Sequence, residues 1–68
     1  MRQIDTIHFI DHDSGEKAIA TVRATSGQIA LCLSIETNGD IEVVMGPNDC
    51  KTLLDALSRA VIVAKDSD

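Results

Sequence analysis

Residues 28–36 read Gln-Ile-Ala-Leu-Cys-Leu-Ser-Ile-Glu, and this stretch decides the fold. Large apolar side chains stand at Ile29, Leu31, Leu33 and Ile35, and small or polar ones stand between them. Strict alternation of this kind predicts a β-strand with one buried face. The rest of the fold follows from the turns on either side of this strand.

The turns before residues 28–36 predict two antiparallel partners. A two-residue hairpin loop at Ser26-Gly27 pairs the strand with residues 17–25, so that small side chains of one strand stand opposite large ones of the other. The polar loop across residues 11–16 then pairs Phe9 with Ala18. Both choices bring apolar side chains to one common face, and this agreement between independent turns supports the pairing.

The turn after residues 28–36 predicts a fourth strand. A three-residue loop over residues 37–39, with Gly39 in the left-handed conformation, pairs Leu33 with Val43. The competing two-residue loop at Asn38-Gly39 would place Glu42 on the apolar face, and we reject it for that reason.

A helix is predicted after the strands. Pro47 suits the first helical position and Asp49 in the first turn favours the helix dipole. One apolar stripe follows at spacings of three and four, formed by Cys50, Leu53, Leu54, Leu57, Val61 and Ala64. We therefore expect one α+β domain over residues 1–68: a four-stranded antiparallel meander (residues 3–10, 17–25, 28–36 and 40–45) with a C-terminal helix (47–65) packed on one face. Leu33 should be buried beneath this helix.

Composition excludes several classes of function. The 68 residues carry a net charge of −5 and a single aromatic side chain, Phe9, so they offer little for phosphate binding or base stacking. No apolar run reaches the ~18 residues of a membrane span. Two cysteines are too few for a disulfide scaffold, and Cys32 and Cys50 are expected on opposite faces, which predicts reduced thiols and a cytoplasmic location.

Candidate chemistry is sparse. Residues 11–16 are similar to the start of a calcium loop, but Gly15 comes one place early and Val22 stands where the final glutamate belongs. A polar turn explains these residues better. A thiol in the first turn of a helix can be activated, yet Cys50 belongs to the apolar stripe. We predict no metal, no cofactor and no enzymatic activity.

Two surfaces are predicted to bind other molecules. In a meander the first and third turns share one end of the sheet, which gathers five acids into an acidic pole: Asp11, Asp13, Glu16, Glu36 and Asp40. A domain this small often needs a partner to be stable, and one helix leaves one face of the sheet open. We expect the apolar residues of that open face to form a homodimer contact: Ile10, Ile19, Ala30, Cys32 and Val44.

Two functions are favoured, and small-molecule binding in a dimer crevice stays open as a third. The first is a non-catalytic acidic module that binds a basic protein surface as inhibitor or adaptor. Small acidic inhibitors from phages and mobile elements, including anti-CRISPR proteins, are similar in size and charge. The alternative is a nucleic-acid-binding or transcription-regulatory module, because four strands followed by a helix resemble the single-stranded-DNA-binding coactivator fold. On the open face, Arg23 alone would serve such binding, so nucleic acid is the less favoured partner.

Overall fold

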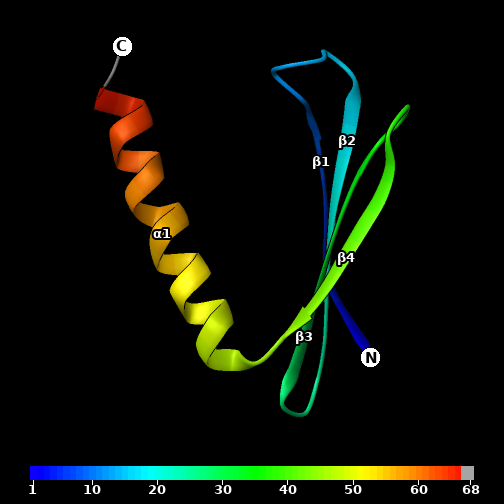
Figure 1. Cartoon of the computed structure of the whole chain (residues 1–68), viewed down its shortest axis with the longest axis vertical. Helices are drawn as coiled ribbons and strands as arrows, with labels where there is room; N and C mark the ends of the chain where they lie inside the picture. The colour runs from blue at the N-terminus through cyan, green and yellow to red at the C-terminus, as the bar shows by residue number, and fades with distance from the viewer. Residues whose placement is uncertain (67–68) are drawn as a thin grey trace.

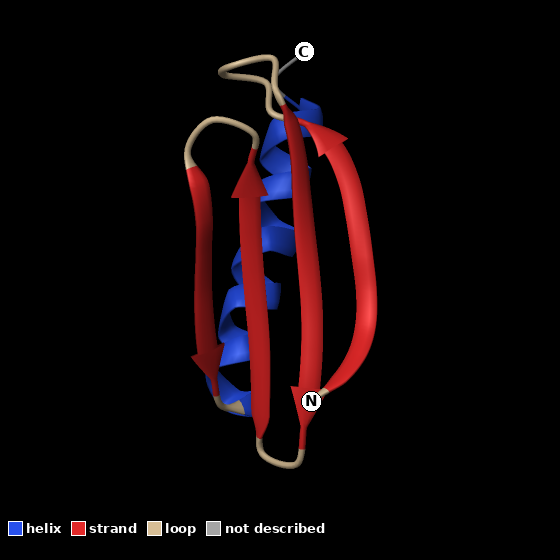
Figure 2. Cartoon of the chain, turned by 90° about the vertical axis from the view of Figure 1, so that its right-hand side faces the viewer, coloured by secondary structure: helices blue, strands red, loops and turns tan. Residues whose placement is uncertain are grey.

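The computed structural model describes residues 1–66 and confirms the α+β arrangement (Figure 1). Its elements are β1 (Arg2–Ile10), β2 (Lys17–Thr25), β3 (Gln28–Ile35), β4 (Gly39–Met45) and α1 (Pro47–Asp66). The strands form one antiparallel sheet in the order β1-β2-β3-β4, a simple meander, and α1 lies behind it (Figure 2). Among residues 1–66, the helix is not long and apolar enough to cross a membrane.

The two pairings that involve β2 are the predicted ones. Phe9 pairs with Ala18, and Ala20 pairs with Leu33. Thr25 pairs with Gln28, which leaves the expected two-residue loop between β2 and β3. The apolar alternation of β3 therefore meets the small side chains of β2 on one face of the sheet, as the turn residues require.

The predicted pairing of β3 with β4 is wrong by two residues. Leu33 pairs with Ile41, not with Val43, and Ile35 pairs with Gly39. The loop therefore spans residues 36–38, and Gly39 is already the first residue of β4, with φ of 72°. Because side chains alternate with a period of two, this shift leaves every apolar residue on its predicted face.

The helix starts where the sequence predicts but covers little of the sheet. Pro47 is its first residue, and the Cys50 N–H donates to the Gly46 carbonyl at 3.1 Å. From there α1 diverges from the strands, and its main contacts with the sheet are with β3 (Figure 1). None of its side chains over residues 47–66 is buried. The expected burial of Leu33 is wrong as well, because its side chain is 44% exposed.

The buried apolar core of residues 1–66 is small and consists of Ala18 and Ala30. Ala30 faces away from α1, in line with Arg23 of β2. The Arg23 guanidinium forms an ion pair with Glu42 of β4, and this pair reaches across β3. The domain is therefore held mainly by strand pairing and turns, since its helix and sheet bury so little against each other.

Candidate functional site

The acidic pole is built by a direct contact between the first and third turns. The Glu16 carboxylate accepts one hydrogen bond from the Thr37 N–H at 3.1 Å and another from the Thr37 hydroxyl at 2.9 Å. These two residues are 21 positions apart in the chain. The meander places the turns at one end of the sheet, and this contact fixes one against the other.

The first turn is organised around Asp11. Its carboxylate accepts hydrogen bonds from the Ser14 hydroxyl at 2.6 Å, the Ser14 N–H at 3.1 Å and the Asp13 N–H at 3.4 Å. The Ser14 hydroxyl bond, followed by the two backbone bonds, lowers the pKa of the Asp11 carboxyl below its ordinary value. Asp11 thus stays ionised and serves the shape of the turn, the role that aspartate has in polar turns.

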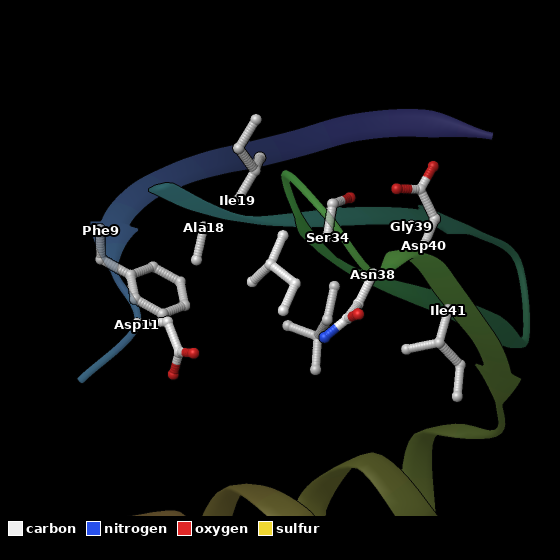
Figure 3. Close-up of a pocket in the computed structure, with 11 residues that line it drawn as sticks. Phe9, Asp11, Ala18, Ile19, Ser34, Asn38, Gly39, Asp40 and Ile41 are labelled. Carbon is white, nitrogen blue, oxygen red and sulfur yellow. The ribbon is translucent and has the colours of Figure 1, made fainter. Parts of the chain in front are cut away.

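The remaining acids are available for binding. Asp13, Glu36 and Asp40 are exposed, and within residues 1–66 their carboxylates accept no hydrogen bond. The pole is not one flat surface, however. Figure 3 shows the Asp40 side chain directed to the side of the sheet opposite to that of Asp11. The acids therefore surround the end of the sheet and give it a negative potential from both faces.

Next to the pole lies an apolar hollow of about 350 Å³ on the helix side of the sheet (Figure 3). Phe9, Leu33 and Ile41 contribute its apolar lining, and Asp11 and Asn38 stand at its edge. The sequence does not predict this hollow, because the apolar stripe of the helix favours packing above these side chains. The alternating pattern identified the lining residues but not their exposure.

The open face, on the side of the sheet away from α1, is only partly exposed. Of the five residues predicted for self-association, Ile10, Ile19 and Val44 are exposed, Cys32 is half-buried, and Ala30 is buried within its own chain. Neighbouring Arg23, the base on which nucleic-acid binding would depend, is already paired with Glu42.

One hollow of about 220 Å³ on the open face is lined by four polar side chains that no hydrogen bond joins to one another: His8, Lys17, Ser34 and Glu36. His8 lies on the open face opposite Ile19, and His12 lies in the first turn. Cys32 and Cys50 are both free thiols. Within residues 1–66, no three side chains of His, Cys, Asp or Glu cluster in a way that could hold a metal ion. The arrangement offers a charged end of the sheet and exposed apolar surface beside it.

Comparison with known proteins adds no relative: no family, no curated protein and no solved structure matches this chain. The resemblance to the coactivator fold thus remains a likeness in the order of elements.

Proposed function

We propose that this protein is a non-catalytic interaction module of the cytoplasm that acts as a homodimer and binds a basic surface of another protein through its acidic pole. Binding would inhibit that protein or adapt it to another. The observation that carries the proposal is the double hydrogen bond from Thr37 to Glu16, which holds two acidic turns together in one fixed arrangement.

A fixed arrangement matters because exposed charges that move independently attract a partner only weakly. Ordering their side chains costs entropy, and salt screens the charges. Here two of the acids, Asp11 and Glu16, are held in place by hydrogen bonds. They support a pole in which Asp13, Glu36 and Asp40 can meet lysine or arginine side chains. Charge complementarity of this type raises association rates and selects the partner.

The test compares two triple variants that carry the same total charge. Asp13→Asn, Glu36→Gln and Asp40→Asn together remove three negative charges at the pole from a protein of net charge −5. The control, Asp49→Asn, Asp55→Asn and Asp66→Asn, removes three from α1, where Asp55 forms an exposed ion pair with Arg59. Each protein is used as bait at low and at high salt in an extract of the cells that carry its gene.

We expect a specific protein to be retained by the wild type and the helix control at low salt, and lost with the pole variant or at high salt. Equal loss of the partner in both variants would show that net charge alone, and not the pole, is responsible, and retention by the pole variant would refute the pole as the binding surface. A gel shift with single-stranded oligonucleotides tests the alternative, and a shift at low salt that disappears in Arg23→Gln would favour nucleic acid as the partner.

A further inference from the structure

The chain exposes more surface than a compact protein of its size. Its accessible surface is 5393 Å² for a mass of 7.3 kDa. A compact monomer of this mass would expose about 4,200 Å², so about 1,200 Å² is in excess. A stable interface of ordinary size buries about 800 Å² on each partner, which the excess can supply.

The excess exposed surface lies where the sheet and the helix face each other across an open angle. The exposed large apolar residues on these two facing surfaces are Ile7, Phe9, Leu33, Ile41 and Val43 of the sheet and Leu53, Leu54, Leu57 and Val61 of the helix. Even near the start of α1, where helix and sheet are closest, a hollow of about 190 Å³ lies between Leu31 and Leu53. We call these two surfaces together the inner faces.

One helix cannot cover the whole sheet. Four strands spaced about 4.8 Å apart span roughly 14 Å between the outer strands, and a helix is only about 10 Å wide. A single residue, Gly46, joins β4 to α1, and the fixed φ of Pro47 follows it. This short connection keeps the first turn of the helix beside β3 and β4, so closure within one chain would leave β1, with Ile7 and Phe9, uncovered.

The inner faces complement each other in shape. One offers a helical apolar stripe, and the other a sheet face with alanines at positions 18, 20 and 24, small enough to let a helix approach closely. The pairing places Arg2 and Asp5 on the sheet's inner face at the start of β1, and Asp11 lines the hollow at the other end of that strand. A two-fold axis would bring the helical stripe of each copy onto the sheet of the other.

We propose that a second copy of this chain covers the inner faces, with the distal half of each α1, around Leu57 and Val61, packed on the Ile7 and Phe9 side of the other copy's sheet. The proposal rests on the homodimer named above but not on the basic partner. It moves the self-association contact from the open face to the inner faces.

The test measures molecular mass in solution by light scattering over a range of protein concentrations, with two matched variants. Val61→Glu places a charge on the helix stripe, and Val44→Glu places the same charge on the open face. The two valines are 53% and 50% exposed in the single chain, so either change should leave the chain folded, which circular dichroism checks.

We expect a wild-type dimer that Val61→Glu converts to monomer and that Val44→Glu leaves intact. The milder Val61→Ser should raise the dimer Kd about a hundredfold, since each dimer holds two copies of residue 61 and each buried valine accounts for about a factor of ten. This milder variant keeps the test decisive if Val61→Glu fails to fold.

Three results would overturn the proposal: a wild-type monomer at every concentration, a Val61→Glu or Val61→Ser variant that dimerises like wild type, or a dimer that Val44→Glu dissociates. Failure of the proposed function is separate from these results. A monomer that still binds a basic partner would refute the inner-face dimer and leave the acidic pole standing, and a dimer that binds no such partner would do the reverse.

Discussion

The conformation of Gly39 gives a sharp test of how the β3–β4 turn is built. Gly39 has φ of 72°, in the left-handed region, and Gly46 does not. A Cβ built on either glycine meets nothing within 4 Å. Alanine should therefore strain the backbone at Gly39 but not at Gly46, and its methyl group has free space at both positions.

The expected magnitudes follow from two effects. Alanine reduces the freedom of the unfolded chain at both positions, which stabilises each variant by about 0.4–1 kcal/mol. At Gly39 alone, alanine must also occupy the left-handed region, at a cost of about 1–2 kcal/mol. The free energies of unfolding of Gly39→Ala and Gly46→Ala should thus differ by about 1–2 kcal/mol, with Gly46→Ala the more stable and at least as stable as wild type.

The assay is urea unfolding followed by circular dichroism, at one fixed protein concentration so that any dimer contributes equally. In a domain of this size a 1 kcal/mol difference also shifts the melting temperature by about 4–8 °C. Gly39→Asn is the rescue variant, because asparagine tolerates the left-handed region better than alanine does. Equal stabilities of the two alanine variants would refute the left-handed conformation of Gly39 and the turn built on it.

Three further predictions concern the polar contacts. Glu16→Ala removes both hydrogen bonds to Thr37 and should lower the free energy of unfolding by about 1–2 kcal/mol, whereas Thr37→Val removes only the hydroxyl bond and should cost about half as much. Urea unfolding measures both losses, and equal losses would contradict the two-bond geometry. Because the pKa of Asp11 is lowered in the folded protein, its contribution to stability is fully present above the ordinary carboxyl pKa and is lost as the pH falls through the lowered value. Asp11→Asn should therefore make the free energy of unfolding less dependent on pH in the acid range. An unchanged pH dependence would argue against the hydrogen bonds of the turn. Glu42→Gln should lower the free energy of unfolding by less than about 1 kcal/mol, because the ion pair of Glu42 with Arg23 is exposed to solvent. Thermal unfolding measures this loss, and a loss of several kcal/mol would show that the pair is shielded from solvent in the assembled protein.

Short-range sequence patterns were enough to predict the strands and the helix, and to predict which face of the sheet each apolar side chain occupies. The alternation of β3 and the start signal at Pro47 predicted the strands and the helix, because side-chain period and backbone constraints act within a few residues. The shared end of the two acidic turns also followed, since a meander leaves no other place for them. The Glu16 contact with Thr37 did not follow, because nothing in a local pattern specifies a bond between residues 21 positions apart.

The sequence by itself determined which residues share a face, and the tertiary structure decided where those faces meet. A two-residue shift between β3 and β4 leaves the apolar pattern unchanged, so the pattern could not choose between Ile41 and Val43 as the partner of Leu33. The choice was made in the folded turn, which spans residues 36–38. Likewise, the stripe on α1 shows that the helix has an apolar side but not what that side packs against. The angle of the helix is set at the short Gly46-Pro47 connection, and the inner faces are exposed because α1 diverges from the strands from that point on.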